Sequence, residues 1–326
     1  MTSTVLVTGG AGFIGAYVTR KLIAEGLRVL VYDMQPRGNV LDLLVPDRSP
    51  NDDRLTVEAG EITDGWRLLE LCRRHKIDAA VHLASPLTMD VVNNPMLGIR
   101  DICLGTQTLF AVAHEIGMRR VVWASSVAIF GPASYYPAGP LPDDAAHRPA
   151  NLYGSCKSLC ETLARRAVEI DKLDVVGLRL SVVYGAGRMR GYMSYPSHLM
   201  REAASEGQVN IKFGPQRLHW QYVEEVAAMA YTALVAPQIG DGRTFNAPGD
   251  CRSWAEAAEA LRGARPDLLV SVGNEIDPAL DGVVEDYDAG GFAERYGYHS
   301  RWPLEAGVRA TLDTYDTIRA RQTGRL

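Results

Sequence analysis

The sequence has no long basic run and no uninterrupted apolar stretch of about 18 residues, and each absence excludes a class of protein. Nucleic-acid-binding surfaces need clustered Lys and Arg, whereas this chain carries a net charge of −5. The N-terminal MTSTVLV also lacks a charged segment followed by an apolar run. We therefore expect no nucleic-acid partner, no membrane association and a cytoplasmic location.

Cysteine is scarce as well. The five cysteines, at positions 72, 103, 156, 160 and 251, are odd in number and scattered, which does not suggest a disulfide framework. Cys156 and Cys160 share one face of a predicted helix, but no CxxC or HxxxH motif lies near them. We interpret both as packing residues and expect no metal site.

What is present is the composition of an ordinary globular protein, with 47% apolar and 22% charged residues. A chain of 326 residues can form one large domain or two modest ones, and either can bury a substantial core. With nucleic acid and membrane excluded, the expected ligand is a small molecule.

Strand and helix patterns alternate through the first half of the chain. Residues 4–33 read TVLVTGGAGFIGAYVTRKLIAEGLRVLVYD, which is a strand, a glycine turn, a helix and a second strand. Strand-like runs follow at 78–84, 119–126 and 173–185, with helical patterns at 96–116 and 153–170. This alternation predicts an α/β fold with a doubly wound parallel sheet of the Rossmann type.

The pattern changes after Gly185 to loops, short helices and brief strands. We interpret residues 1–180 as an NAD-binding Rossmann domain and residues 181–326 mainly as a smaller C-terminal substrate-binding lobe, with some strands returning to the Rossmann sheet. The substrate cleft is then expected between the lobes, beyond the carboxyl ends of the strands.

The glycine turn has the spacing of a dinucleotide-binding loop. Gly9, Gly12 and Gly15 follow a strand and open a helix, so they allow a tight turn, a close approach of the backbone to pyrophosphate and close packing of helix on strand. A purely structural turn is the alternative, and Asp33 argues against it. A carboxylate at the end of the second strand can accept hydrogen bonds from the adenosine ribose and repel a 2′-phosphate, which favours NAD over NADP. Arg37 weakens that preference.

A candidate catalytic pair lies at the start of the helix at 153–170. Tyr153 and Lys157 form a YxxxK motif, one helical turn apart on the same face. An isolated tyrosine, with a pKa of about 10, is a poor base at neutral pH, but a nearby ammonium and a positive nicotinamide ring favour the phenolate. Ser125 or Ser126, at the end of the strand at 119–126, can hold the substrate oxygen.

Motifs along the whole chain resemble those of the extended short-chain dehydrogenase/reductases, the NAD-dependent epimerase/dehydratase family. They are TGGAGFIG (8–15), VYD (31–33), HLAS (82–85), GTQTLF (105–110), SSVAIFG (125–131), YGSCK (153–157), LRLSVVYG (178–185) and QYVEEVA (221–227). The resemblance implies catalysis by Ser126 rather than Ser125, with Tyr153 as acid/base and Lys157 as its support. It also implies NAD contacts from the glycine loop and five later positions, namely Gly9, Gly12, Phe13, Ile14, Gly15, Asp33, Glu61, Ile62, Leu83 and Ala84, besides Tyr153 and Lys157.

The chain departs from the pattern of the sugar-nucleotide members in its second half. Val182 stands where those members carry an Asn that holds pyrophosphate, Leu218 stands at the position of a phosphate-binding Arg, and no Arg lies between Pro266 and Gly291. Losing three polar anchors disfavours sugar nucleotides as substrates, unless Arg188, Arg190 or Arg217 compensates. The candidate substrate-binding residues are Ser85, Ser126, Arg188, Tyr192 and Trp220.

Three functions remain at this point. The first is an NAD-dependent oxidoreductase that acts on a secondary alcohol or ketone of a small polar substrate without a nucleotide. The second is an NAD-dependent sugar or nucleotide-sugar 4-epimerase, and the third is a non-catalytic NAD-binding sensor. A dehydratase would need acidic residues next to the serine, where Val127 and Ala128 stand. The resemblance further implies a homodimer, paired through the helices at 96–116 and 153–170.

Overall fold

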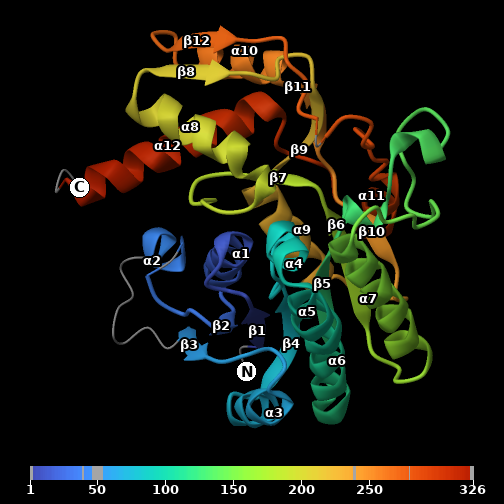
Figure 1. The fold of residues 1–326 in the computed structure, drawn as a ribbon. Coiled ribbons are helices and arrows are strands. Elements are labelled where there is room, and N and C mark those ends of the chain that lie inside the picture. Colours follow the sequence, from blue (N-terminus) through green and yellow to red (C-terminus); the bar gives the residue numbers. More distant parts are fainter. Residues whose placement is uncertain (1–2, 39, 46–53, 238–239, 279, 324–326) are drawn as a thin grey trace.

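The computed structural model describes residues 3–38, 40–45, 54–237, 240–278 and 280–323 (Figure 1). Within these residues a sheet of seven parallel strands has the order β10-β6-β5-β4-β1-β2-β3. The strands are β1 (Thr4–Thr8), β2 (Arg28–Asp33), β3 (Leu55–Ala59), β4 (Ile77–His82), β5 (Arg120–Ser126), β6 (Val175–Leu180) and β10 (Thr244–Asn246). The predicted doubly wound Rossmann sheet is confirmed.

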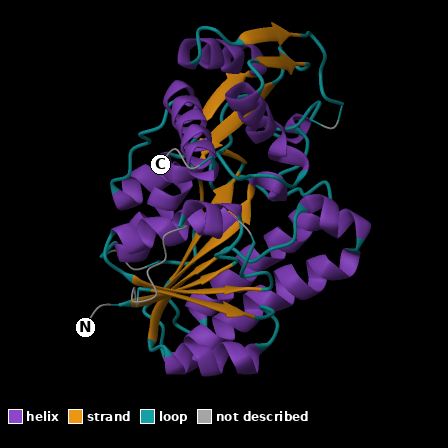
Figure 2. Ribbon diagram, turned by 90° about the vertical axis from the view of Figure 1, so that its left-hand side faces the viewer, coloured by secondary structure: helices purple, strands orange, loops and turns teal. Residues whose placement is uncertain are grey.

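Helices cover both faces of this sheet, because its side chains alternate between two cores. Val5 and Val7 pack into one core, and Leu6 between them packs into the other. The first core is closed by α1 (Phe13–Ala24), α2 (Val40–Leu44) and α9 (Val223–Val235). The second is closed by α3 (Gly65–Arg74), α4 (Thr88–Asn93), α6 (Gly105–Ile116) and α7 (Leu152–Glu169). Figure 2 shows the strands fanning out between these helical layers.

The helix predicted at 96–116 is continuous but not uniform. It consists of α5 (Pro95–Leu97), a π-helical turn η1 (Gly98–Leu104) and α6. The span Pro95–Ile116 is long and apolar enough to cross a membrane by length and composition alone, with a mean hydropathy of 1.2. Its inward side packs against α3 and α7 as part of the sheet's cover, so we interpret it as a core helix.

The strand-like run at 173–185 divides at Ser181. β6 stays in the large sheet, whereas β7 (Val182–Tyr184) joins β9 (Arg217–Tyr222) and β11 (Asp250–Ser253) in a three-stranded sheet. The Ser181 N–H donates to Gln221 Oε1 at 2.8 Å instead of to a neighbouring strand. The chain leaves the Rossmann sheet at this residue.

The smaller lobe lies above the carboxyl ends of the large sheet (Figures 1 and 2). Besides the three-stranded sheet it contains β8 (Gln208–Ile211), β12 (Leu269–Val272), α8 (Tyr195–Ser205), α10 (Trp254–Ala264), α11 (Gly290–Tyr296) and α12 (Leu304–Gln322). The short 3-10 turns are η2 (Val127–Ile129), η3 (Ala133–Tyr135) and η4 (Tyr192–Ser194). The division at residue 180 stays a prediction, since α9 and β10 follow it in sequence but pack with the Rossmann layers.

Candidate active site

The glycine loop lies where the strand order reverses, between β1 and β4. Gly9 has a φ of +67°, and a Cβ built there would lie 2.8 Å from Ala84 N. A Cβ on Gly15 would lie 2.1 Å from the carbonyl oxygen of Gly9. Only glycine therefore fits at either position, and their close packing sets the start of α1 directly after β1. Open α/β sheets bind their ligands in the crevice beyond this switch point.

The loop fits a dinucleotide. A Cβ on Gly12 would meet a single atom within 4 Å, the Gly9 carbonyl oxygen at 3.3 Å, so this part of the backbone is open. The free N–H groups at the start of α1 and the helix dipole favour an anion beside it. Leu83 and Ala84 continue the same crevice from β4, with their N–H groups bonded to Thr8 O at 3.0 Å and Thr8 Oγ1 at 3.4 Å.

Asp33 ends β2 beside the loop. Its Oδ2 accepts from Ala11 N at 3.1 Å and its Oδ1 from Gln35 N at 3.0 Å, so the carboxylate is fixed beside the glycine loop. Ile62 is buried at the same edge and Glu61 is exposed. Phe13 and Ile14 are partly buried against the first core. The predicted cofactor residues thus lie along one edge of the sheet.

Replacing Asp33 with Ser is expected to weaken NAD binding by roughly tenfold and to improve the relative use of NADP, because the charge facing the 2′ position is removed. Kd values for both cofactors, measured by calorimetry, check this. Arg37→Gln keeps the carboxylate and serves as the matched control, which should retain the NAD preference. An unchanged ratio of the two Kd values in Asp33→Ser would refute the assignment.

The candidate catalytic pair is fixed by its own helix. The Asn151 side chain caps α7 by accepting from Gly154 N at 2.9 Å. Lys157 is buried, and its Nζ donates to the carbonyl oxygen of Ala124 at 2.9 Å and lies 5.8 Å from the centre of the Tyr153 ring. The ammonium is therefore held between the end of β5 and the tyrosine.

The two serines at the end of β5 point in opposite directions. Ser125 Oγ donates to Glu161 Oε1 at 2.7 Å inside the core. Ser126 Oγ accepts from Ala128 N at 3.2 Å, and among the described residues it has no acceptor for its own hydrogen. Ser126 can donate that hydrogen to a ligand, whereas Ser125 cannot.

The sequence analysis missed two buried groups that pack next to this site. His82, within β4, bonds through Nδ1 to Thr8 Oγ1 at 2.7 Å and through Nε2 to Thr106 Oγ1 at 3.2 Å. Burial, reinforced by the charge of Lys157, lowers the pKa of His82 to about 3 and keeps the ring neutral. The available signal was a histidine at the end of a mostly apolar strand.

The second missed group is an ion pair behind Ser125. Arg179 donates from Nε to Glu161 Oε1 at 2.9 Å and from Nη2 to Glu161 Oε2 at 2.8 Å. Burial raises the pKa of Glu161, but hydrogen bonds from Arg179, His147 and Ser125 outweigh it and lower that pKa to about 2. Both side chains are almost fully buried.

Cys156 and Cys160 are buried, as expected of packing residues. Cys160 Sγ lies 3.5 Å from both Ile102 O and Thr106 Oγ1, on the side of α7 that faces η1 and α6.

The predicted substrate residues are not equally placed. Ser85 follows Ala84 and donates from Oγ to Pro86 O at 3.0 Å. Arg188 is half-buried in the loop after β7, with Nη1 donating to Val183 O. Trp220 is 2% exposed, its Nε1 is bonded to Arg252 O, and its ring packs on Trp254 and Tyr184. It is a core residue, so a role in substrate binding is withdrawn. The Tyr192 side chain lies outside the described residues.

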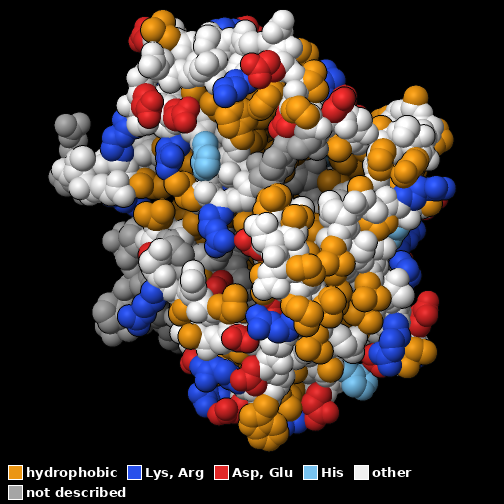
Figure 3. Space-filling model, in the orientation of Figure 1, with side chains coloured by type: hydrophobic (Ala, Val, Ile, Leu, Met, Phe, Trp, Pro, Cys, Tyr) orange, Lys and Arg blue, Asp and Glu red, His pale blue; other side chains and the backbone are white. Residues whose placement is uncertain are grey.

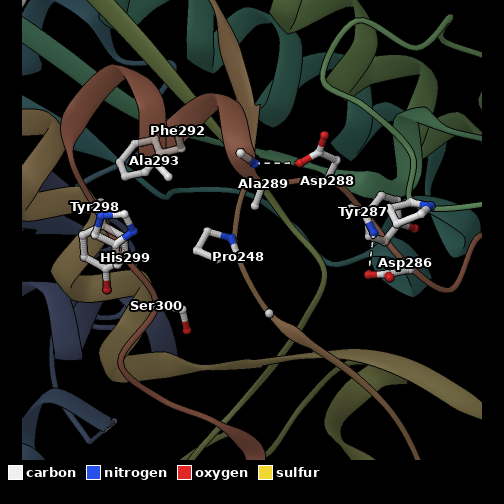
Figure 4. A pocket seen from close by; sticks show the side chains of 13 residues that line it. Pro248, Asp286, Tyr287, Asp288, Ala289, Phe292, Ala293, Tyr298, His299 and Ser300 are labelled. Carbon is white, nitrogen blue, oxygen red and sulfur yellow. Dashed lines mark hydrogen bonds between the residues drawn. The ribbon is translucent and has the colours of Figure 1, made fainter.

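A separate cavity has a volume of about 520 Å³, and Figure 4 shows the side chains that line it. Its walls come from the segments around Pro248, Asp286 to Ala293, and Tyr298 to Ser300. None of the residues predicted to bind cofactor or substrate lines it. In the part of the chain that the structure describes, no group of three or more potential metal ligands occurs.

Comparison with known proteins places these observations in a family. The model of the "NAD dependent epimerase/dehydratase family" matches residues 5–247. The D-erythronate dehydrogenase of Cupriavidus necator is 29% identical over 95% of this chain and 98% of its own length. A UDP-glucose 4-epimerase of Lactobacillus helveticus is 30% identical, but the match spans 56% of this chain and 52% of that protein.

A solved structure gives the same fold. The UDP-glucose 4-epimerase of Thermotoga maritima, crystallised with UDP-glucose, superposes with a TM-score of 0.83 at 22% identity, covering 96% of this chain and 99% of that one. The family match extends from β1 to β10 and so includes the glycine loop, Asp33 and the Tyr153–Lys157 pair. The chain therefore belongs to the NAD-dependent epimerase/dehydratase family, and it is an enzyme of the extended short-chain dehydrogenase/reductase type with NAD as its cofactor.

Proposed function

We propose that the protein is an NAD-dependent oxidoreductase that acts on a secondary alcohol or ketone of a small polar substrate without a nucleotide. The observation that carries this proposal is the arrangement of Tyr153, Lys157 and Ser126 at the carboxyl end of β5. The similarity to D-erythronate dehydrogenase over nearly the whole of both chains supports it.

In this proposal each side chain has a defined task. Lys157, held by Ala124 O, supplies a positive charge beside the Tyr153 ring and so favours the phenolate, which takes the proton of the substrate hydroxyl. Ser126 donates its free hydrogen to the same oxygen and fixes its position. Bound NAD supplies the hydride acceptor for oxidation and the hydride donor for reduction.

The proposal that the substrate carries no nucleotide rests on Val182 and Leu218. Both side chains pack in the first hydrophobic core and are only 6% and 4% exposed. They therefore offer no hydrogen bond to a phosphate. The nearby Arg217 pairs with Glu256 at 3.3 Å, and its guanidinium also bonds to Cys251 O. A pyrophosphate in the cleft would lack the anchors that sugar nucleotides require.

An epimerase remains the second candidate, because UDP-glucose 4-epimerases match about half of the chain and share its fold. We expect a panel of polyols, sugars and hydroxy acids to yield one NADH per product molecule, measured by absorbance and chromatography. UDP-glucose should neither turn over nor raise the melting temperature. Interconversion of UDP-sugars without net NADH would decide for the epimerase, and stable NAD binding without any turnover would favour a sensor.

We also propose a homodimer through the surface formed by α5, η1 and α7, in a cytoplasmic protein. Figure 3 shows hydrophobic side chains gathered over this region. The exposed ones include Met96, Ile99, Leu104, Leu152 and Leu159. A contiguous apolar surface of this kind marks an interface more often than a free face.

Sedimentation is therefore expected to show a dimer of the 35.6 kDa chain at micromolar concentration. Leu159→Arg should shift it toward the monomer, because a charge would be buried in the contact. Trp66→Arg is the matched control, since Trp66 is 79% exposed on α3, outside this surface. A wild-type protein that sediments only as a monomer would refute the dimer.

A further inference from the structure

Arg188 is the unusual cation of this cleft. It lies in the loop between β7 and η4, and its Nη1 donates to the carbonyl oxygen of Val183. A guanidinium carries five N–H donors in a planar fork. The single contact to Val183 holds the side chain in place and leaves the edge formed by Nε and Nη2 without an acceptor among the described residues.

By contrast, the two fully buried arginines among the described residues, Arg120 and Arg179, have carboxylate partners. Arg120 forms a bidentate contact with Asp174 through Nε and Nη2, at 2.9 and 2.7 Å. Arg179 forms the same kind of bidentate contact with Glu161. Within the described part of the chain no acidic side chain forms an ion pair with Arg188. Burial lowers the pKa of Arg188 to about 10, and it still carries its charge at neutral pH.

The loop brings this charge to the reacting end of the cleft. Gly185 and Gly191, on either side of Arg188, lie against Phe13 of the glycine loop and Leu87 after β4. Tyr153 is close enough to interact electrostatically with the Arg188 guanidinium. A substrate whose hydroxyl meets Tyr153 and Ser126 therefore has a half-buried cation without a counter-ion beside it.

We propose that Arg188 binds the carboxylate of the substrate, and that the substrate is consequently a hydroxy acid. A carboxylate matches the planar Nε/Nη2 edge with two parallel hydrogen bonds, while the secondary hydroxyl of the same molecule meets Tyr153. A neutral polyol would leave this half-buried charge unpaired. A pyrophosphate would need further cations, but the neighbouring Arg190 is exposed and pairs with Asp90 at 3.4 Å.

This inference rests on the proposed oxidoreductase function, and matched substrates test it. The C3 to C5 aldonates and the alditols of equal length and configuration differ only in the carboxylate. The acids are expected to exceed the alditols in kcat/KM by at least about a hundredfold, because that is the effect of one bidentate, charge-assisted contact. Equal values for an acid and its alditol would overturn the inference while leaving the oxidoreductase function intact.

Arg188→Met should raise KM for the acids by about a hundredfold, leave the alditols nearly unchanged and preserve the Kd for NAD. Arg188→Lys should recover part of the loss. Arg190→Met is the matched control, because it removes an adjacent arginine that is exposed and already paired. A weaker Kd for NAD in Arg188→Met, with acids and alditols affected alike, would assign Arg188 to the cofactor instead.

Calorimetry on the protein saturated with NADH gives a readout that does not require turnover. The aldonates are expected to bind the wild type and Arg190→Met but not Arg188→Met, even if none is oxidised. Failure of turnover with retained, Arg188-dependent binding would count against the oxidoreductase function alone. Failure of every acid to bind, or Arg188-dependent binding of UDP-glucose instead, would overturn the carboxylate assignment.

Discussion

Tyr153→Phe is expected to lower kcat by about a hundred- to ten-thousandfold, the usual contribution of general acid–base catalysis. The ring is retained, so its packing in the second core and its contact with the Lys157 ammonium should persist. The Kd for NAD should therefore stay close to that of the wild type. Steady-state turnover and calorimetry with NAD, on the same preparation, separate the two effects.

The cysteines of the same helix provide the controls. Cys156→Ala and Cys160→Ala remove buried sulfur atoms without touching the Tyr153–Lys157 pair, and both should remain close to wild type in kcat. A Cys160→Ala variant as inactive as Tyr153→Phe would instead assign the chemistry to the thiols. A fully active Tyr153→Phe would remove tyrosine from the mechanism altogether.

The elements proposed to hold the cofactor were the most predictable part of the molecule, for a physical reason. The residues of β1, the glycine loop and α1 are contiguous, so their spacing alone predicts a strand, a turn that only glycine permits, and a helix. Asp33 is the last residue of β2, and the order of a parallel sheet places it beside the loop. Local sequence and topology agree here.

Predictions that depended on which way a side chain points were less successful. Trp220 lies on a strand, where alternate residues face opposite sides, and its sequence neighbourhood did not show that its ring packs between Tyr184 and Trp254. Ser181 is one polar residue in an apolar run. The strand ends there because the Ser181 N–H donates to the side-chain amide oxygen of Gln221, a contact that the local sequence does not show. Both depend on residues distant in sequence.

The buried ion pair next to the active site could not be predicted for the same reason. Glu161 and Arg179 are separated by 18 residues, and a glutamate on a helix is normally assigned to its solvated face. The pair becomes buried because α7 packs over the ends of β5 and β6. His147 comes from the long loop before α7, and its Nε2 lies 3.3 Å from Glu161 Oε2.

This burial leads to a large expected effect on stability. Glu161 accepts hydrogen bonds from Nε and Nη2 of Arg179 and from Ser125 Oγ. Glu161→Gln would therefore leave a buried guanidinium without its counter-ion. Breaking a buried ion pair on one side costs about 3–5 kcal/mol. Urea unfolding at pH 7 should show a loss of that size. Glu169→Gln, at the exposed end of the same helix, should change the free energy of unfolding by less than about 0.5 kcal/mol.

The pH dependence provides an independent check on the same pair. The pKa of Glu161 falls from 4.5 to about 2 in the folded protein, which corresponds to roughly 3 kcal/mol of stability. Because the folded pKa is the lower one, this stability is present above about pH 4.5 and is lost as the pH falls toward 2. Wild type should therefore lose more free energy of unfolding than Glu161→Gln between pH 5 and pH 3, as followed by urea titrations at each pH. Parallel curves for the two proteins would show that the carboxylate is not held in its charged form by Arg179.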